Sequence, residues 1–560
     1  MLQFAIGNDD FGEIRQKGFV FVDKSGLIQE LLSRAGDKVT LITRPRRFGK
    51  TLNISMLHHF LAATVSGEPT HSLFEGLQIT HDSSCMAHQG QYPVICFSLK
   101  GIKATSFESA VQDTGTCLRT LYKQYEYLLT SPTLSQDDHR LFYRIVNLEA
   151  THANINLSLQ ELSRWLHAYH GVKPWILIDE YDTPIQTAYL EGYYNDMIKL
   201  MQKFLGNALK TNAHFERAVL TGIVRASQES LFSDLNNVGV YTLFNEEYSE
   251  HFGFTESEVS ELLVQTGLVT QGPVIKDWYN GYLCGNTTLY NPWSIINCLS
   301  RKGSLQPYWV QTGGTAMIQD LLARADRSVK THFEDLLSGK PIQMRISEHL
   351  AFGFLGGGLN AVMSLLLAAG YLKALSRTQE RTKWLCSLQI PNHEVMTVFE
   401  ECVLQWFASK NQQERYEGLL QALIIGDART FTREMKLFFE RTVSYFDASQ
   451  QQPEKFYHGF VLGMVVSLAK THTIESNRES GAGRYDVVLV PHDISQPGVI
   501  MEFKVAYEDE TLQEAAEKAL SQIKAKGYAA TLHQRRITQV LALGLAFSGK
   551  QVTIQHEWLE

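Results

Sequence analysis

The feature that most constrains the fold is an alternation of short apolar segments with longer helical segments between residues 39 and 225. The short segments are rich in residues that favour strands, and each is long enough for a buried strand: VTLIT from Val39, YPVICFSL from Tyr92, PWILID from Pro174 and RAVLTGIV from Arg217. Strands that alternate with helices are typical of a parallel sheet covered by helices. The pattern therefore predicts an α/β fold for this part of the chain.

The chain of 560 residues is too long for one hydrophobic core, since domains of about 150 residues are usual. We expect an α/β domain at residues 1–285. A mainly helical region is expected at 286–450, where apolar residues recur at three-to-four spacing in two long segments. From 451 to 560 the pattern is helix, three strands, helix and strand, which is an αβββαβ order. The content of 44% hydrophobic and 20% charged residues is typical of soluble globular proteins.

Charge and cysteine content exclude several classes of protein. Because the formal net charge is −8, any nucleic acid must be bound by a local basic surface. The seven cysteines include no CxxC pair, which argues against a structural zinc site or a disulfide framework and favours a reducing cytoplasm. The N-terminus, MLQFAIGNDDFGEIRQ, lacks the basic start and the apolar stretch of a signal peptide.

One segment, residues 351–372, carries no charge over 22 residues and is long enough to span a membrane. It contains five glycines and one asparagine, and no basic or aromatic belt flanks it. These features favour a buried loop and helix. We therefore expect no membrane insertion.

A tight turn between a strand and a helix lies in VTLITRPRRFGKTLNISMLHHFL. Its end supplies what a P-loop needs, namely backbone amides around phosphate, a lysine for the terminal phosphates and a hydroxyl for Mg²⁺. Arg44 occupies the position of the usual first glycine, and Pro45 has no amide to donate. The alternative is an ordinary turn with a chance GKT. The candidate nucleotide-binding residues of the turn are Arg46, Arg47, Phe48, Gly49, Lys50 and Thr51.

Two other strands carry polar residues close to the same predicted sheet edge. WILIDEYD places Asp179 and Glu180 at a strand's carboxyl end, where α/β sheets bind ligands. Asp179 is predicted to complete the Mg²⁺ shell and Glu180 to orient the attacking water, although both acids can instead cap the next helix. Thr221 is a candidate γ-phosphate sensor or only a strand former, and Arg225 can reach phosphate in its own or a neighbouring subunit. Since no guanine-reading NKxD is present, adenine is the favoured base.

The last strands place ionisable residues within apolar runs, in GRYDVVLVPHDISQPGVIMEFKVA. Because side chains alternate along a strand, Glu502 and Lys504 share one face, and a hairpin would bring Asp486 beside Glu502. Two carboxylates form a hard-oxygen site for Mg²⁺ or Mn²⁺, and such a metal with a lysine can cleave a phosphodiester. Glu479 is a candidate further ligand, with a surface glutamate as the alternative. For the whole set, the alternatives are solvated charges on an edge strand or a buried ion pair.

The motifs of the chain, taken together, resemble the bacterial AAA-ATPase-like proteins that end in a PD-(D/E)XK nuclease-superfamily domain. The resemblance covers nearly the whole chain and is least marked in the middle. It rests on RPRRFGKT, FVDKSGL from Phe21, LIDEYDTPI from Leu177, TGIVRASQESLFSDLNN from Thr221, WYNGY from Trp278, YNPWSIINCL from Tyr290, NRESGAGRYD from Asn477 and IMEFKV from Ile500.

This resemblance implies an N-terminal P-loop ATPase with an added catalytic glutamate, fused to a restriction-endonuclease-like fold. In this group an arginine at the position of Arg44 looks normal. One departure concerns related RecB-like nucleases, because Gln522 is followed by a tyrosine only at Tyr528 and the QxxxY spacing is not met. The residues that match the nucleotide motifs are Lys50, Thr51, Asp179 and Glu180, and those that match the nuclease motifs are Asp486, Glu502 and Lys504.

Three hypotheses of function follow. The first is an ATP-regulated, Mg²⁺- or Mn²⁺-dependent nuclease that acts on DNA. The second is a nucleotide-dependent switch whose last domain binds nucleic acid or a partner without cleavage, which the acidic net charge favours. Translocation along DNA ranks last, because no helicase-like series of strand-end motifs is present. Arg225 acting in a neighbouring subunit would require a homo-oligomer.

Overall fold

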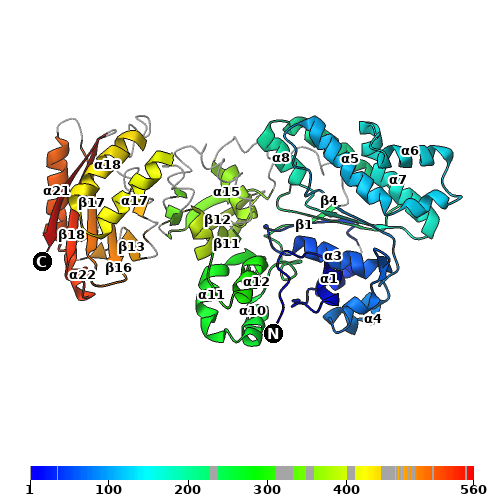
Figure 1. Cartoon of the computed structure of the whole chain (residues 1–560), viewed down its shortest axis with the longest axis horizontal. Helices are drawn as coiled ribbons and strands as arrows, with labels where there is room; N and C mark the ends of the chain where they lie inside the picture. The colour runs from blue at the N-terminus through cyan, green and yellow to red at the C-terminus, as the bar shows by residue number, and fades with distance from the viewer. Residues whose placement is uncertain are drawn as a thin grey trace. The chain divides into compact units, whose positions relative to one another are not determined.

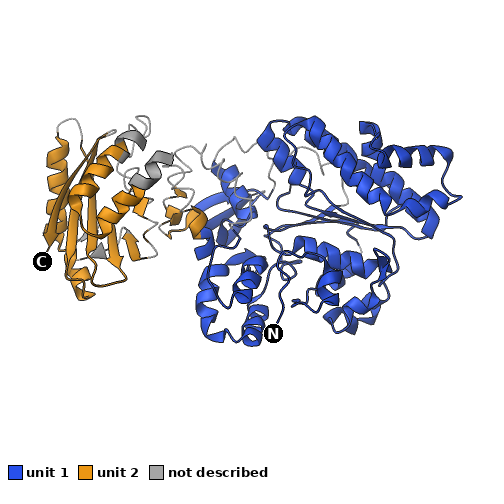
Figure 2. Ribbon diagram, viewed as in Figure 1, with its two compact units in different colours: residues 1–317, 343–395 blue, residues 318–342, 396–560 orange. Residues whose placement is uncertain are grey.

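The computed structural model describes residues 2–34, 36–210, 212–225, 238–309, 332–333, 335–337, 339–348, 359–381, 383–399, 410–442, 461, 464–465, 468, 471–476, 479–480, 483–484, 486–506, 510–548 and 551–559. The chain divides into two compact units (Figure 2). Unit 1 comprises residues 1–317 and 343–395, and unit 2 comprises residues 318–342 and 396–560.

Unit 1 is built on a five-stranded sheet in the order β4-β5-β6-β1-β7. All four pairings are parallel, so the predicted α/β fold with a parallel sheet is confirmed. The four predicted strands are present, and a fifth, short strand that the sequence pattern did not indicate lies at one edge. The strands are β1 (Val39–Thr43), β4 (Val94–Ser98), β5 (Trp175–Asp179), β6 (Ala218–Gly222) and β7 (Val238–Tyr241).

Helices cover both faces of this sheet (Figure 1). On one face lie α1 (Phe11–Gln16) and α3 (Lys50–Leu61), and α2 (Gly26–Ser33) contributes to the same hydrophobic core. The other face carries α5 (Phe107–Lys123), α6 (Gln136–Val146), α7 (His152–His170), α8 (Thr183–Glu191) and α9 (Tyr194–Leu209). All residues of β1, β5 and β6 are buried, which fits their nearly continuous apolar sequences.

A smaller helical group follows the sheet within unit 1. Its helices pack around a separate core of apolar residues. The sequence TESEV, with Thr255 and Glu258 three residues apart, predicts a capping box, and the first helix begins there. Thr255 accepts from the Glu258 amide, and the Glu258 carboxylate accepts from the Thr255 amide. The elements are α10 (Glu256–Thr266), α11 (Gly272–Tyr279), β8 (Tyr282–Cys284), β9 (Thr287–Leu289) and α12 (Pro292–Ser300).

The middle of the chain contains α15 (Leu359–Ala368), but it also contains strands that the expectation of a mainly helical region did not include. The strands β10 (Ile342–Ile346), β12 (Lys383–Gln389) and β11 (Lys373–Glu380) form a three-stranded sheet. Tertiary packing explains the difference, because the Trp384 ring of β12 stacks on Phe244 beyond β7, with ring centroids 5.2 Å apart.

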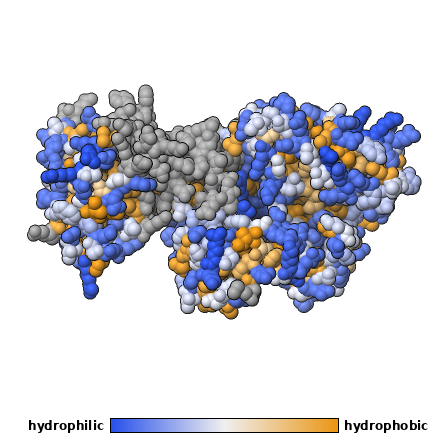
Figure 3. All heavy atoms as spheres, viewed as in Figure 1, coloured by the Kyte–Doolittle hydropathy of each residue, from blue (hydrophilic) through white to orange (hydrophobic). Residues whose placement is uncertain are grey.

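Of the uncharged segment at residues 351–372, only the part from residue 359 is described. Across the described part of the chain, every helix is too short or too polar to cross a bilayer. The face shown in Figure 3 is largely hydrophilic, with smaller hydrophobic patches.

Unit 2 is built on a mixed sheet in the order β13-β16-β17-β18-β19. One face packs on α17 (Lys410–Ile424) and α18 (Ala428–Thr442), and the other on α21 (Leu512–Lys526) and α22 (Ala529–Gln534). Of the predicted αβββαβ order, the first helix lies largely outside the described residues, and the final strand β19 is additional. The strands are β13 (His472–Ser476), β16 (Val487–Pro491), β17 (Gly498–Val505), β18 (Val540–Ser548) and β19 (Gln551–Leu559).

Glu394 is a buried carboxyl that ties the end of unit 1 to α12. Its oxygens accept from the Ser294 hydroxyl at 2.7 and 2.9 Å and from the Trp309 amide at 2.8 Å. Burial raises the pKa of Glu394 to about 7 from an ordinary value of 4.5. The folded state therefore binds this proton more tightly than the unfolded state does, so the carboxyl's contribution to stability falls as pH rises from 4.5 through 7.

Replacing Glu394 with glutamine, which keeps an acceptor oxygen, is expected to remove this pH dependence. Relative to wild type, the free energy of unfolding of E394Q should rise by about 2.5 kcal/mol between pH 5 and pH 8. Urea unfolding at a series of pH values measures this difference. The exposed Glu261 of α10 provides the control E261Q, whose stability should follow that of wild type at every pH. A constant difference between E394Q and wild type would contradict the prediction.

Candidate functional site

The strand-to-helix turn after β1 is shaped by backbone conformations that favour glycine. Gly49 has φ +80° and precedes the first residue of α3, and Arg47 has φ +65°. Lys50 is buried, and its Nζ donates to the carbonyls of Arg44 at 3.2 Å and Pro45 at 2.8 Å. Burial lowers the pKa of Lys50, while nearby carboxylates oppose the shift. The ammonium therefore lies inside the turn, in the position from which a P-loop lysine approaches phosphate.

Arg44 has a structural position of its own. Its guanidinium is fully buried, and its Nη1 and Nη2 atoms donate to five carbonyl oxygens. The acceptors are Thr43 at 2.8 Å, Tyr241 at 3.2 Å, Thr242 at 3.0 Å, Glu247 at 3.3 Å and Tyr248 at 3.1 Å. The side chain thus joins the turn to the end of β7 and the segment after it. This accounts for an arginine where a P-loop usually has glycine, because Arg44 keeps a negative φ and its side chain is directed into the protein.

Asp179 at the end of β5 accepts from two hydroxyls on neighbouring elements. Thr51 of α3 donates to its Oδ2 at 2.7 Å, and Thr221 of β6 donates to its Oδ1 at 2.6 Å. Burial raises the pKa of Asp179, and the two hydroxyl donors oppose this rise. The sheet order places β5, β6 and β1 side by side, so three residues from distant parts of the sequence meet at one edge. These oxygens are suited to a Mg²⁺ ion and its water ligands.

Glu180 follows Asp179 in a left-handed backbone conformation, with φ +51°. Its carboxylate accepts from the Thr183 hydroxyl at 3.2 Å and lines the cavity that the turn encloses. This conformation is energetically unfavourable for a residue with a Cβ, and residues held in such conformations are common at functional sites. Glu180 therefore places a carboxylate on the wall of this cavity.

The cavity at the turn has a volume of about 350 Å³. It is strongly cationic on the side of the turn, while apolar side chains from several separate segments line it as well. The guanidinium of Arg47 lies 4.2 Å from the centre of the Trp293 ring. The cationic residues are Arg46, Arg47, Lys50, Lys100 and Lys103, and the apolar residues include Ala5, Val20, Val22, Phe48, Phe254, Trp293 and Ile296. Such a combination is suited to a nucleotide, since phosphates and base need different surroundings.

Sequence reasoning missed Trp293 and the two lysines of this cavity as site residues. Trp293 lies in the YNPWSIINCL motif, which served only for the family resemblance. Lys100 and Lys103 follow β4 without any motif, and only the sheet order brings them to the same edge as β1 and β5. The local sequence pattern does not contain the order of the strands in the sheet, and that order is what would have indicated these residues.

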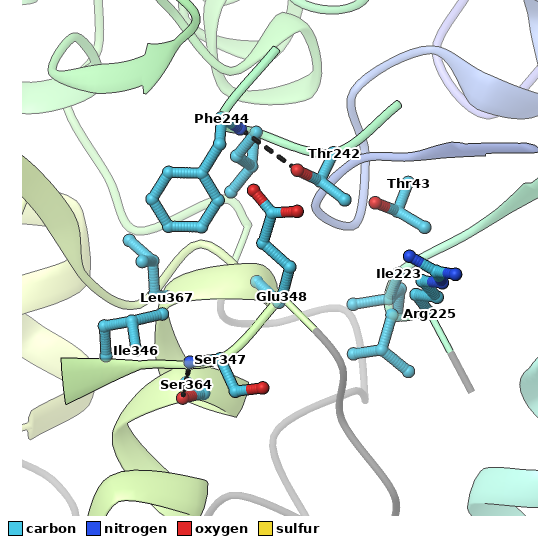
Figure 4. A pocket seen from close by; sticks show the side chains of 13 residues that line it. Thr43, Ile223, Arg225, Thr242, Phe244, Ile346, Ser347, Glu348, Ser364 and Leu367 are labelled. Atoms are coloured by element: carbon cyan, nitrogen blue, oxygen red, sulfur yellow. Dashed lines mark hydrogen bonds between the residues drawn. The ribbon is translucent and has the colours of Figure 1, made fainter. Parts of the chain in front are cut away.

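Arg225 lies beyond the end of β6 and lines a different, small cavity with Thr43, Thr242 and Glu348 (Figure 4). It is not among the described residues around the nucleotide-type cavity, although its neighbour Ile223 is. Burial lowers the pKa of Arg225, and the charge of Glu348 opposes this shift. Glu348 in turn accepts from the Trp384 indole at 2.7 Å. In this structure Arg225 therefore faces the sheet β10-β12-β11 of unit 1.

In unit 2, the antiparallel pairing of β16 and β17 sets Val487 opposite Met501. Asp486 precedes Val487, so this register places it beside Glu502, and its Oδ2 accepts from the Phe503 amide at 2.7 Å. The predicted hairpin is thus confirmed. Glu502 is only 2% exposed, and its Oε1 lies 3.5 Å from the Nζ of the partly exposed Lys504. Two acids and a lysine therefore lie close together on one face of the sheet, where the pairing of β16 with β17 ends.

The helices after β17 bring two further residues to Glu502. Gln522 of α21 donates a hydrogen bond to Glu502 Oε1. Tyr528 is buried, and its hydroxyl interacts with Gln522. The chain reverses between them at Gly527, which ends α21 with φ +65°. Tyr528 can therefore reach Gln522 although the QxxxY spacing is not met, and sequence spacing alone missed this role.

Glu479 lies in the two-residue strand β14 (Glu479–Ser480), paired with Arg484 of β15 (Gly483–Arg484), and its side chain is outside the described residues. Among the described residues, no group of three or more His, Cys, Asp or Glu side chains is arranged around a common metal position. Asp486 and Glu502 nevertheless fit Mg²⁺, which usually takes one or two carboxylates and completes its shell with water and substrate oxygens.

Two parts of the chain match models of known protein families. Residues 5–232 match the family model described as a predicted AAA-ATPase, and residues 452–557 match the PD-(D/E)XK nuclease superfamily. A protein of Azotobacter chroococcum mcd 1, described as an uncharacterized protein in the vnfD 5′ region, is 26% identical over 551 residues. That match covers 98% of this chain and 96% of the relative. The chain carries an AAA-ATPase-like domain followed by a PD-(D/E)XK nuclease-superfamily domain, which confirms the resemblance in its motifs.

Proposed function

We propose that this protein binds and hydrolyses ATP and that the nucleotide state regulates a metal-dependent nuclease acting on DNA. The observation that carries the proposal is the meeting of Asp486, Glu502 and Lys504 from two paired strands, in a chain whose other unit has a P-loop turn. A buried glutamate beside a second acid is costly unless a cation neutralises them. The acidic net charge of −8 makes local basic groups responsible for binding DNA.

In the ATPase domain, Lys50 would leave the carbonyls of the turn and bind the terminal phosphates of ATP. Thr51 and Asp179 would hold Mg²⁺, which offsets the charge of the phosphates when it is bound. Glu180 would orient the attacking water, and Thr221 would report the γ-phosphate through its bond to Asp179. Arg46 and Arg47 add positive charge, and the apolar part of the cavity would accept the adenine.

In the nuclease domain, Asp486 and Glu502 would hold Mg²⁺ or Mn²⁺, with Glu479 as a further candidate ligand. The metal would polarise the scissile phosphate and activate a water. Lys504 would position or deprotonate that water and offset the charge that develops on the phosphate. Gln522 fixes the orientation of Glu502 through its hydrogen bond to Oε1.

The proposal extends to location and assembly. We place the protein in the cytoplasm, where the cysteines, all free among the described residues, would stay reduced. Arg225 would bind phosphate either after its side chain leaves the small cavity or by contacting a nucleotide that is bound to a neighbouring subunit. A homo-oligomer formed in the presence of ATP would support the second route.

Replacing Lys504 with alanine is expected to reduce DNA cleavage about 1000-fold, because both the water and the developing charge lose their lysine. Purified protein would be incubated with Mg²⁺ or Mn²⁺, with and without ATP, on single-stranded and duplex DNA and on RNA. The exposed Lys518 of α21 supplies the control K518A, which should cut like wild type. Equal cleavage by K504A and wild type would contradict the proposal.

The second candidate is a nucleotide-dependent switch whose last domain binds nucleic acid or a partner without cleavage. The acidic net charge favours it, because such a charge opposes tight binding to DNA. Titration with Mn²⁺ separates the two candidates. Binding by wild type that is lost in D486N supports the nuclease, whereas a wild-type protein that binds no metal supports the switch.

A further inference from the structure

Asp182 is a buried carboxylate of unit 1 that the proposed mechanism does not use. The side chain is 1% exposed. In the sequence, Asp182 lies two residues after Glu180. Its Oδ2 accepts from the backbone amides of Ile223 at 2.9 Å and Val224 at 3.0 Å. The carboxylate therefore joins the segment after β5 to the turn after β6.

The usual role of an aspartate at this position does not explain Asp182. It is the N-cap residue of α8, where an aspartate side chain commonly accepts from the first backbone amides of the helix. Here its side chain makes no such capping bond. It is turned toward β6 instead, and burial raises its pKa because the ionised form loses water. The side chain of Asp182 does not cap α8 but bonds to the turn after β6. The segments that it connects should therefore explain its role.

Asp182 belongs to a set of bonds that fastens one segment to the end of β6. The Tyr181 amide donates to the Thr221 carbonyl at 3.0 Å, and the Tyr181 hydroxyl donates to the Val224 carbonyl at 2.7 Å. Between them Gly222 leaves no space, because a Cβ there would lie 2.7 Å from the Tyr181 ring and 2.8 Å from Asp182 Oδ1. We name residues 180–182 the strap, since they lie tightly along the end of β6.

Glu180 is the first residue of the strap, and its φ of +51° is unfavourable for a residue with a Cβ. Such a conformation costs about 1–3 kcal/mol and persists only where surrounding contacts enforce it. The bonds of Tyr181 and Asp182 are those contacts. The strap also reaches the phosphate-binding turn, because Gln186 donates to Asp182 Oδ2 at 2.8 Å and accepts from Arg46 at 3.3 Å.

We propose that Asp182 is a positioning residue for ATP hydrolysis, whose carboxylate holds the strap against β6 so that Glu180 stays directed into the nucleotide cavity. This inference rests on the proposed function, since it assigns Asp182 a role that acts through Glu180. It also predicts that Asp182 affects the chemical step and not the binding of ATP, because Asp182 is absent from the described lining of the cavity.

The test compares D182N with wild type in steady-state ATP hydrolysis and in equilibrium binding of a fluorescent ATP analogue. Both amides donate to Oδ2, while Oδ1 is buried without a hydrogen-bond partner among the described residues. An asparagine can keep an oxygen at Oδ2 only by burying an unpaired NH₂ group at the position of Oδ1, and it loses the negative charge that strengthens the amide bonds. We expect kcat to fall about 100-fold, which is the effect of displacing a catalytic group by about 1 Å. The Kd of the analogue should stay within about 3-fold of the wild-type value. The exposed Asp137 of α6 gives the control D137N, which should match wild type.

The double variant D182N/E180Q distinguishes positioning from a general loss of structure. If Asp182 acts through Glu180, the double variant hydrolyses ATP no more slowly than E180Q alone. Y181F, which removes the bond to the Val224 carbonyl, provides a milder change in the same strap and should lower kcat about 5-fold.

Negative results would bear either on this inference or on the proposed function. A wild-type protein that hydrolyses ATP together with a D182N of unchanged kcat would overturn this inference and leave the proposed function intact. A double variant slower than E180Q by the full effect of D182N would also overturn it. A wild-type protein that binds ATP but never hydrolyses it would overturn the proposed function itself.

Discussion

Replacing Glu180 with glutamine is expected to slow ATP hydrolysis about 1000-fold while ATP still binds. The carboxylate lines the cavity of the phosphate-binding turn and is held there in a left-handed backbone conformation. Glutamine has nearly the same shape and can still accept from the Thr183 hydroxyl, so the strap and the cavity should persist. Only the negative charge that orients and polarises the attacking water is removed.

Two measurements check this expectation on the same sample. Phosphate release should be almost absent in E180Q, and the Kd for a fluorescent ATP analogue should be close to that of wild type. K50A is the complementary control, because loss of the lysine should weaken binding itself. If E180Q lost affinity and turnover together, Glu180 would be a ligand of the nucleotide and not the residue that orients the water.

The same variant tests whether the nucleotide state regulates cleavage. Because E180Q would retain ATP, its nuclease activity should stay at the level that wild type shows with a non-hydrolysable ATP analogue. Wild type should change its cleavage rate as ATP is consumed. Identical cleavage by E180Q and wild type under all nucleotide conditions would show that the nucleotide state does not regulate the nuclease.

The elements that the sequence predicted correctly have a strong local signal. β1, β4, β5 and β6 are short apolar runs, and the GKT turn and the Thr255 capping box consist of residues a few positions apart. The register of β16 and β17 followed from the alternation of acids and apolar residues. In each case, the residues that determine the structure lie within one segment.

The residues that sequence reasoning missed depend on long-range contacts. Arg44 bonds to carbonyls about 200 positions away along the chain, which no local pattern indicates. Trp293 reaches the nucleotide cavity from α12, and Tyr528 reaches Gln522 only through the reversal at Gly527. The strands β11 and β12 were likewise assigned to a helical region. β11 is a polar edge strand without a clear alternation, and β12 lies between β10 and β11, a pairing that no local pattern indicates.

Arg225 shows a different limit of sequence reasoning. Its place just beyond a strand end made it a candidate for phosphate binding, and the strand end was predicted correctly. The direction of its side chain depends on what packs beside β6. In this structure Glu348, from the region after β10, lies across the small cavity from it (Figure 4).

Replacing Arg44 with methionine is expected to lower the free energy of unfolding of unit 1 by about 3–5 kcal/mol, because several buried carbonyls lose their donor at once. Methionine fills much of the same volume, so the loss is mainly one of hydrogen bonds. Lysine at this position keeps a charge but cannot reach acceptors in the fixed planar geometry of a guanidinium, so R44K should recover only part of the stability. Urea unfolding of the full chain measures these differences.

The variant R44G separates a structural role from a role in binding phosphate. If the arginine merely replaced the first glycine of the P-loop, restoring glycine would leave stability unchanged and preserve ATP affinity. The five carbonyl acceptors of its guanidinium argue otherwise. We therefore expect R44G to be at least as unstable as R44M, since it also leaves a cavity. R46M is the matched control in the same turn, and it should weaken ATP binding while leaving the unfolding midpoint near that of wild type, because Arg46 lines the nucleotide cavity and is only partly buried.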